Sequence, residues 1–598
     1  MRKSVGAVEQ KVGLRRDEMC QERNEVRDGM QITWDAAIQM DDGVVLRADI
    51  FRPVGEGKYP VIMSYGPYGK GLAFQDGYKT AWQSMERDYP DAVTGTSNAY
   101  ANWEVVDPEK WAPHGYVVVR VDSRGAGRSP GYLCHNNHRE QKDYHECIEW
   151  AAVQPWSTGK VGLNGISYYG ANQWRAAATQ PLHLAAICVW EGWHDNYRDG
   201  NRHGGILCTF RKNWQDMQVK TVQHGVGERG ATSRLTGERV CGPETLTNDE
   251  LVRNREDMHH EMLSRPLLTD YYKERSVDLT KVQVPLLSAA NWGGQGLHAR
   301  GNFEGFIGAA STQKWLEVHG GSHWAPFYTD YGVALQKRFF DYFLKGESNG
   351  WQDQSKVQLQ VRHLDRYVLR YEDEWPLART AWTSLYLDPH TLQLSDSPPQ
   401  FASTLQYRAM GKGVTLTTPP LSADTEFTGP ASLKLIVSSS TADADFFVVL
   451  HVFDPAGNEV TFQGALDPKA PLTQGWLRAS QRKLDPARSV PYRPFHSHDE
   501  SQPLTPGEIY ELDIEIWPTC VVLPKGYRLG LTIMGRDYEH GLEQSTLSNM
   551  KNPMKGCGPF LHDDPLDRPS EIFDNMVTLH FDPERPATLL VPVIPERS

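Results

Sequence analysis

The stretch that most constrains this chain covers residues 161–174 and reads VGLNGISYYGANQW. It predicts a short apolar strand, a tight turn around Ser167 and then a helix that begins with small residues. A serine at the apex of such a unit points its hydroxyl away from the sheet, and Gly165 and Gly170 would let the helix pack against the strand. The spacing is Gly-x-Ser-x-x-Gly, because Tyr169 stands where a second glycine is more common. The pattern predicts a nucleophile elbow; an ordinary Gly-Ser turn before a helix is the alternative.

Composition excludes several classes of function. The chain has 598 residues, more than one ordinary domain, and a net charge of −13 with no basic face that would suit nucleic acid. No stretch approaches the roughly 20 apolar residues of a membrane span, and the first residues lack an apolar signal core. The eight cysteines are scattered without CxxC pairs, which is typical of reduced thiols. We therefore expect a cytoplasmic protein without a nucleic-acid or membrane partner.

The patterning along the chain predicts four segments. Residues 1–30 are polar and charged, and we expect a loose N-terminal arm. Apolar strands alternate with helices over 31–195 and 281–370, which predicts a parallel sheet covered on both faces, an α/β domain. The segment 196–280 is polar and helix-prone, so we expect a helical cap inserted over the carboxyl edge of the sheet. Alternating strands between turns over 371–598 predict an antiparallel β-sandwich.

Several longer motifs occur in a fixed order. They are Pro67-Tyr68-Gly-Lys70, Asp122-x-Arg124-Gly-x-Gly-x-Ser129, Gln154-Pro-Trp-Ser-x-Gly-Lys160, Gly165-Ile-Ser167-Tyr168-x-Gly170 and Gly320-Gly-Ser-His323. In this order they resemble the family that contains cocaine esterase, the X-Pro dipeptidyl-peptidases and the α-amino acid ester hydrolases. The resemblance extends over about residues 30–590. It implies an α/β-hydrolase domain, a helical cap and a jelly-roll-like C-terminal domain.

An acyl-transfer serine hydrolase needs a nucleophile, a base, an acid that orients the base, and donors for the oxyanion. Ser167 is the candidate nucleophile. His323 is the candidate base, because it follows the last apolar strand, where the chain order Ser, acid, His places it in α/β-hydrolases. His319 competes for this role, but it falls at the strand end, where side chains are often merely packed.

Two donors are candidates for the oxyanion site. The backbone N–H of Tyr168 lies at the start of the predicted helix and points where the oxyanion forms. The resemblance implies that the Tyr68 hydroxyl is the second donor. A phenol with a pKa near about 10 stays protonated at neutral pH and can donate without changing charge. An ordinary loop aromatic is the alternative for Tyr68.

The acid departs from the family pattern. The family places an Asp after the strand that precedes the histidine, and this chain has Gly294 there. Glu191 ends the preceding predicted strand and is our choice for the acid, because an acid one strand earlier can reach the imidazole in some α/β-hydrolases. Asp195 and Glu304 are weaker candidates, and a site with no acid at all is a further alternative.

Other polar clusters favour structural roles. The Cys134-His135-Asn-Asn-His138 cluster lacks a fourth metal ligand, and Gly125-Ala-Gly127 lacks the third glycine of a dinucleotide loop. Asp443-Ala-Asp445 favours a strand edge over a calcium site. We therefore expect no metal and no cofactor.

These residues predict a serine hydrolase that cleaves carboxylic esters or activated amides of small molecules through an acyl-enzyme. The aromatic segment 72–111 and the cap would form the acyl pocket. One alternative is an X-Pro dipeptidyl aminopeptidase, which needs carboxylates in the cap to hold the substrate amine. Another is a non-catalytic binding protein with a decayed triad. A homo-oligomer is compatible with the composition.

Overall fold

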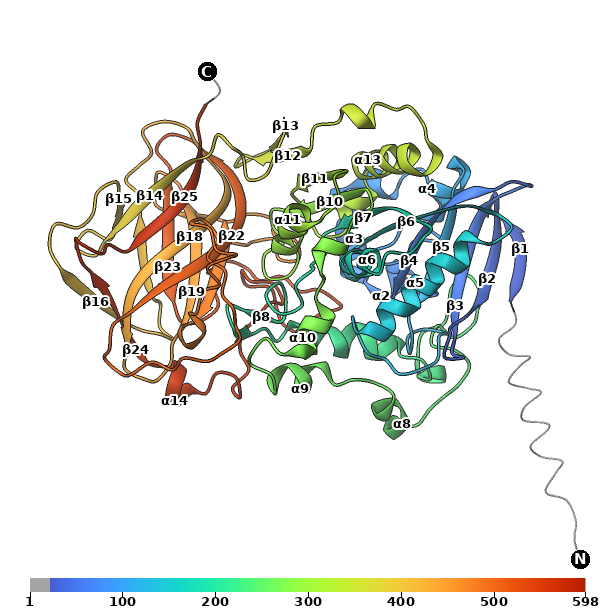
Figure 1. The fold of residues 1–598 in the computed structure, drawn as a ribbon, viewed down its shortest axis with the longest axis horizontal. Helices are drawn as coiled ribbons and strands as arrows, with labels where there is room; N and C mark the ends of the chain where they lie inside the picture. The colour runs from blue at the N-terminus through green and yellow to red at the C-terminus, as the bar shows by residue number, and fades with distance from the viewer. Residues whose placement is uncertain (1–21, 597–598) are drawn as a thin grey trace, which may run out of the picture.

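The structure is a computed structural model that describes residues 22–596 (Figure 1). Most of the expected N-terminal arm, residues 1–21, lies outside the described residues. Its described end is not loose, because Arg23–Arg27 forms strand β1 and pairs antiparallel with β2 (Met30–Gln39). The expectation of an arm extending to residue 30 is therefore wrong for this part.

The first sheet has eleven strands in the order β1-β2-β3-β5-β4-β6-β7-β10-β11-β12-β13. Besides β1 and β2, its strands are β3 (Val45–Pro53), β4 (Tyr59–Gly66), β5 (Val117–Asp122), β6 (Ser157–Ile166), β7 (Leu184–Trp190), β10 (Leu286–Asn291), β11 (Lys314–His319), β12 (Val357–Arg362) and β13 (Tyr367–Glu372). Neighbours from β5 through β12 are parallel, and the pairs at both edges are antiparallel. A tight turn at residues 41–43 joins β2 to β3.

Helices cover both faces of this sheet, as the sequence predicts. The helices of this part of the chain, with α7 to α10 in the insertion, are α2 (Phe74–Gly77), α3 (Lys79–Asp88), α4 (Pro108–Trp111), α5 (His138–Ala152), α6 (Tyr168–Ala178), α7 (Phe210–Trp214), α8 (Asn248–Arg253), α9 (Met258–Leu263), α10 (Asp270–Arg275), α11 (Ala299–Gly308), α12 (Ala325–Tyr328) and α13 (Asp330–Phe340). In β7, Ile187 and Val189 pack in one core with α5 and α6, whereas Cys188 faces a second core that contains Phe339 of α13. Strands buried on both faces read as continuous apolar runs, which is the pattern of this sequence.

The aromatic segment 72–111 is more regular than the sequence suggests. It contains α2, α3 and α4, and α3 buries Ala81 and Met85, which are one helical turn apart. The ring of Tyr78 stacks on Trp103 with centroids 3.8 Å apart. Two buried positions one turn apart give too weak a helical pattern to predict α3 from the sequence.

The insertion between β7 and β10 holds α7 to α10 and two short strands, β8 (Arg202–His203) and β9 (Ile206–Leu207). Its helices are only five or six residues long. Trp214 of α7 donates a hydrogen bond to the Tyr68 hydroxyl (3.0 Å), so the insertion reaches the loop that follows β4. In Figure 1, β8, α9 and α10 of this segment lie near the all-β domain, whereas α8 lies below the first sheet.

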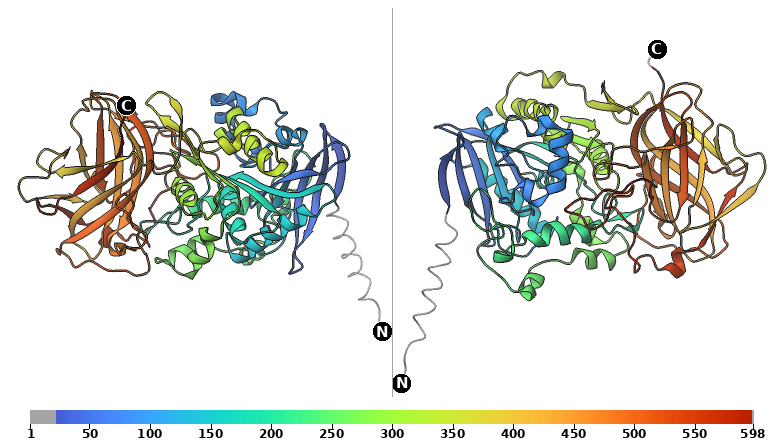
Figure 2. Two further views of the ribbon diagram at one scale, coloured as in Figure 1. Left: turned by 45° about the horizontal axis from the view of Figure 1, so that its top comes forward. Right: turned by 180° about the vertical axis from the view of Figure 1, so that it is seen from behind.

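The C-terminal part is an all-β domain (Figure 2) with one short helix, α14 (Ser570–Phe573). Its strands are β14 (Ala381–Asp388), β15 (Gln393–Ser395), β16 (Ser403–Arg408), β17 (Val414–Thr417), β18 (Thr425–Ser439), β19 (Asp445–Phe453), β20 (Glu459–Val460), β21 (Thr473–Arg478), β22 (Tyr510–Leu523), β23 (Arg528–Met534), β24 (Met576–Phe581) and β25 (Thr588–Ile594). All-β content and antiparallel pairing agree with the sequence. The strands are linked in a single sheet, which closes because β25 pairs with both β14 and β18.

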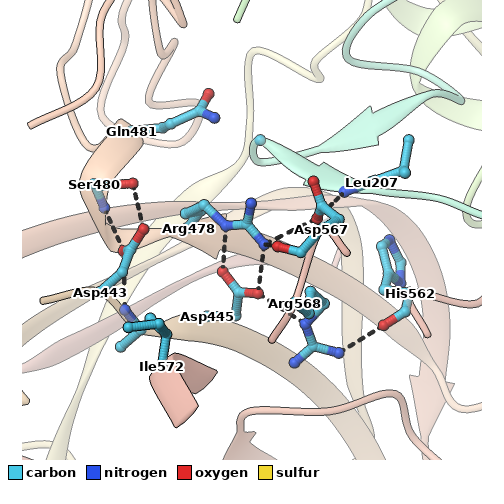
Figure 3. Close-up of polar contacts among 12 residues, drawn as sticks. Leu207, Asp443, Asp445, Arg478, Ser480, Gln481, His562, Asp567, Arg568 and Ile572 are labelled. Atoms are coloured by element: carbon cyan, nitrogen blue, oxygen red, sulfur yellow. Dashed lines mark hydrogen bonds and ion pairs between the residues drawn. The ribbon is translucent and has the colours of Figure 1, made fainter. Parts of the chain in front are cut away.

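A polar network joins the insertion to the all-β domain (Figure 3). Asp445, at the start of β19, accepts hydrogen bonds from Arg478 (2.8 and 2.9 Å) and from Arg568 (2.8 Å). Asp567 accepts from Arg478 (3.0 Å) and from Arg202 of β8 (2.8 Å). Each buried carboxylate is thus paired with arginine, which agrees with a structural role for Asp445.

Within residues 22–596, no helix is both long enough and apolar enough to span a membrane.

Candidate active site

Ser167 occupies a strained turn between β6 and α6. Its backbone has φ 57° and ψ −112°, a conformation that non-glycine residues rarely adopt. A Cβ at Gly165 would lie 2.5 Å from Tyr169 Cβ, and one at Gly170 would lie 2.6 Å from the carbonyl oxygen of Trp190. The two small residues that the sequence analysis singled out are therefore required by close packing, and the expected strand–turn–helix geometry is present.

The side chain that contacts Ser167 is His298. The distance between Ser167 Oγ and His298 Nε2 is 3.0 Å, and both residues are buried. His298 directly precedes α11, in the loop that follows β10. His298 was not among the residues predicted from the sequence, although the family pattern places its acid in this same loop, at Gly294. A histidine four residues after that glycine was the available signal.

His323 does not contact Ser167 in this structure. Its Nδ1 lies 2.7 Å from Glu191 Oε2, and its Nε2 lies 2.9 Å from Glu104 Oε1. The ring of His323 stacks on that of His298, with centroids 4.6 Å apart and planes inclined by 13°. The expected Ser167–His323 hydrogen bond is absent because Glu104 occupies the nitrogen that would make it.

Glu191 lies where the sequence analysis expected the acid to act. Besides His323, it contacts His319 Nε2 (3.1 Å) and accepts from Asn291 Nδ2 (3.1 Å). Its backbone φ is 45°, so this residue is also held in a strained conformation. Glu191 is fully buried and contacts both His323, the predicted base, and His319, the competing histidine that was expected to be merely packed.

The weaker acid candidates have other partners. Asp195 pairs with Arg198 at 2.8 Å, and Glu304 pairs with Arg493. Glu104, which the sequence analysis did not consider, comes from the aromatic segment and has a backbone φ of 62°. Its carbonyl oxygen accepts from Ile166 N (2.9 Å), so the same residue supports the elbow and contacts His323.

Burial and mutual attraction set the charges of this cluster. Burial opposes ionisation of Glu191, but His323 and His319 outweigh it and lower its pKa to about 2. Burial also works against a charged His323, yet Glu191 and Glu104 raise its pKa to about 10. Burial raises the pKa of Glu104 to about 7. Burial and the neighbouring His323 hold the pKa of His298 well below its usual range, so His298 is neutral at pH 7.

The two oxyanion candidates lie beside the elbow. Tyr168 is the first residue of α6, where backbone N–H groups have no intrahelical acceptor. The Tyr68 ring packs on Tyr168 and Tyr169, with centroids 6.3 and 5.6 Å away. Burial raises the pKa of Tyr68 well above its usual value, so its hydroxyl keeps its proton. The Tyr168 hydroxyl points elsewhere and donates to Glu140 (2.7 Å).

Two groups of residues have the composition of a metal site. One atom from each of Glu191, His298 and His323 lies within 4.8 Å of the others, and the same holds for His203, Cys208 and His562. Three protein ligands are the number found in catalytic zinc sites. The sequence cluster around Cys134 forms neither group: His135 Nδ1 lies 3.4 Å from the Tyr168 hydroxyl instead.

A strained serine that touches an imidazole at the carboxyl edge of a largely parallel sheet is the working arrangement of serine hydrolases, and the fold and site together define this class. A family model described as X-Pro dipeptidyl-peptidase (S15 family) matches residues 42–325. The model of the X-Pro dipeptidyl-peptidase C-terminal non-catalytic domain matches residues 349–589.

Solved structures and sequences agree with this class. A CocE/NonD family hydrolase from Staphylococcus aureus is 32% identical, with a TM-score of 0.82 over 96% of this chain and 97% of that chain. Cocaine esterase from Rhodococcus sp. is 23% identical over 93% of this chain and 97% of its own length. An Xaa-Pro dipeptidyl-peptidase from Streptococcus gordonii is 21% identical over 84% of this chain and 73% of its own. The chain belongs to the CocE/NonD family of hydrolases, as the sequence motifs indicated.

Proposed function

We propose that this hydrolase cleaves carboxylic esters and activated amides through an acyl-enzyme formed on Ser167. The observation that carries the proposal is the strained Ser167, whose Oγ lies 3.0 Å from an imidazole nitrogen. Ser167 Oγ attacks the acyl carbon, the imidazole takes its proton, and the leaving alcohol or amine receives that proton. Water then attacks the acyl-enzyme by the same route and releases the acid.

The contact with Ser167 supports His298 as the group that takes the proton. His298 is neutral at pH 7 and therefore able to accept a proton, whereas both nitrogens of His323 face carboxylates. In this proposal the stacked His323 ring positions the His298 ring, and the Glu191 carboxylate offsets the charge that His298 gains. The sequence-based choice of His323 as base is the alternative, and it requires His323 to exchange Glu104 for Ser167.

The oxyanion is proposed to be held by the Tyr68 hydroxyl and the Tyr168 backbone N–H. Preorganised donors that meet the charge only as it develops stabilise the transition state more than the substrate. Trp214 donates to the Tyr68 oxygen (3.0 Å), which leaves the phenolic proton of Tyr68 available for a second partner.

Tyr68→Phe tests this assignment because it removes one donor and keeps the ring. We expect kcat for an ester to fall by about 10² to 10³, with KM nearly unchanged, since the donor acts mainly in the transition state. Steady-state kinetics on a chromogenic ester measure both constants. A raised KM with normal kcat would instead make Tyr68 a substrate-binding residue.

The surroundings favour a substrate with an apolar or aromatic acyl group. Tyr78, Trp103, Trp193 and Trp214 are buried close to the elbow and the histidines. Aromatic walls offer large apolar contact area with defined geometry. The same residues give a reason for the deep burial of Ser167, of which 7% is exposed.

X-Pro dipeptidyl-peptidase activity is the second candidate, because relatives carry that name. Such an enzyme needs a free carboxylate near the site for the substrate amine. Glu256, a buried carboxylate of the insertion, is already paired with Arg275 at 3.0 Å. This pairing favours the ester reading.

The finer architecture that we propose follows the family resemblance. The largely parallel sheet is an α/β-hydrolase domain, the insertion between β7 and β10 is its cap, and the closed all-β sheet is a jelly-roll-like domain. The strand order β3-β5-β4-β6 supports the first of these assignments, since the crossover places the elbow strand β6 in the middle of the sheet.

A substrate panel distinguishes the two candidate activities. The purified full chain is assayed with aryl esters of aliphatic and aromatic acids, with amino acid esters and with chromogenic X-Pro dipeptide amides. We expect kcat/KM to be highest for a simple ester with an apolar acyl group and at least about tenfold lower for every X-Pro amide. A higher value for an X-Pro amide would contradict the proposed substrate class.

A further inference from the structure

A cavity lies at the junction of the sheet, the insertion and the all-β domain. It has a volume of about 1160 Å³. Its walls come from α5, α6, α11, the residues after β7, the α10 region and the 487–495 loop of the all-β domain. Ser167, His298, His323 and Tyr68 do not line it. Trp193 lies between, with its ring 5.9 Å from both the Arg175 guanidinium carbon and the His298 ring centroid.

Arg175 and Arg300 are the two most buried basic residues that line this cavity. Arg175 is 2% exposed, and its Nε and Nη1 donate to the carbonyl oxygens of Arg275 and Ala171, both at 2.8 Å. Its Nη2 has no hydrogen-bond partner, and no carboxylate within residues 22–596 forms an ion pair with it. Burial lowers the pKa of Arg175 to about 10, so the group is still charged at neutral pH. A buried charge without a partner is costly unless a ligand supplies one.

Other buried donors repeat this pattern in the same cavity. Arg300, also 2% exposed, uses Nη1 and Nε on Asp199 and Glu515 (2.8 Å each), which leaves Nη2 without a described partner. Arg198 Nε is also buried without a described hydrogen-bond partner. Native structures leave few buried donors unsatisfied, so an acceptor bound in this cavity would complete the hydrogen bonds of these groups.

The charges of the lining side chains also favour an anion as the ligand. Seven of its lining side chains are arginine or lysine and four are carboxylates, although the whole chain has a net charge of −13. Ion pairs already neutralise most of the buried arginines: Arg198 pairs with Asp195, Arg493 with Glu304, and Arg300 with Asp199 and Glu515. Arg175 is the lining arginine for which residues 22–596 supply no ion pair. We propose that this cavity binds a small organic anion through its carboxylate or phosphate groups, with Arg175 as the inner ligand.

The walls also indicate the size and character of the anion. Guanidinium groups match the paired oxygens of carboxylates and phosphates. Ile307, Leu268 and Phe495 add apolar surface, which favours an organic anion over a bare inorganic one. The volume would accommodate a molecule of cofactor size. This inference does not depend on the proposed catalytic role of Ser167.

Binding is tested on the full chain by isothermal titration calorimetry at pH 7 with citrate and, separately, with pyrophosphate. Sodium chloride at the same ionic strength corrects for general screening. We expect saturable binding of one anion per chain for at least one probe. Arg175→Gln should weaken it by at least about tenfold, because a charge-assisted hydrogen bond is lost. The probe that binds more tightly tells carboxylate from phosphate recognition.

Matched variants make the result decisive. Arg488 on the cavity rim and Arg366 outside it have side chains 64% and 61% exposed, and each pairs with an aspartate. Arg488→Gln combined with Lys281→Gln should weaken binding even if Arg175→Gln fails to fold, whereas Arg366→Gln should have no effect. Ser167→Ala should bind normally. Heats equal to those of sodium chloride, or binding unchanged in the cavity variants, would overturn the proposal.

Discussion

Ser167→Ala is expected to lower kcat for ester hydrolysis by about 10⁶, the size of loss that follows removal of the nucleophile in a serine hydrolase. It should also abolish labelling by a fluorophosphonate, since only an activated serine reacts quickly. The thermal midpoint of unfolding should stay nearly unchanged, because the hydroxyl contributes little packing. Chromogenic ester kinetics, intact-mass spectrometry after labelling and thermal unfolding measure the three effects.

Ser157→Ala is the matched control for this experiment. Ser157 is buried at the start of β6, the strand that ends at the elbow, and its hydroxyl accepts from Gly159 N (3.1 Å). This variant should keep its activity and its labelling. Ester turnover within tenfold of wild type in Ser167→Ala would refute the nucleophile assignment, and with it the proposed acyl-enzyme.

Glu191→Gln is expected to lower kcat by at least about tenfold, because the negative charge of Glu191 favours the imidazolium that forms on His298. The carboxylate serves His323 (2.7 Å), His319 (3.1 Å) and Asn291 (3.1 Å) at once. A glutamine offers one acceptor oxygen and no charge, so a protonated imidazole in this cluster would lose its counterion. Ester kinetics at pH 7 to 9 measure the loss.

Glu317→Gln is the matched control, because Glu317 is buried and contacts His319 Nδ1 (2.7 Å). If Glu191 acts through His323 or His298, the control should keep most of its activity. Equal losses in both variants would show that the cluster matters for folding or stability, and not specifically through Glu191.

The pH profile identifies the base within the same experiment. His298, with a lowered pKa, should give a kcat/KM that is flat between pH 7 and 9. If His323 were the base, its raised pKa of about 10 would make kcat/KM rise with pH across this range. Glu104→Gln would then free His323, lower its pKa and increase activity at pH 7. We expect no such gain.

Local pattern in the sequence determined the elements that carry the site. Apolar runs with glycine at set spacings specify the elbow at Ser167 without help from distant residues, because strand, turn and helix are all local. Glu191 could be placed near His323 for a related reason. Parallel strands end at one edge of a sheet, and β7, β10 and β11 are neighbours, so residues that follow them meet there.

Only the tertiary structure decided which imidazole meets Ser167. His298 is 131 residues from Ser167 in the chain, and Glu104 is 219 residues from His323. Neither lies in a periodic segment that would indicate where its side chain points. The path of a loop depends on what it packs against, and here the aromatic segment and the start of α11 both pack on the elbow. The closure of the all-β sheet through β25 has the same origin, since it depends on pairing between strands far apart in the chain. Periodicity in the sequence specifies which face of a strand is buried, whereas the partners of a side chain are chosen by contacts that form only when distant segments come together.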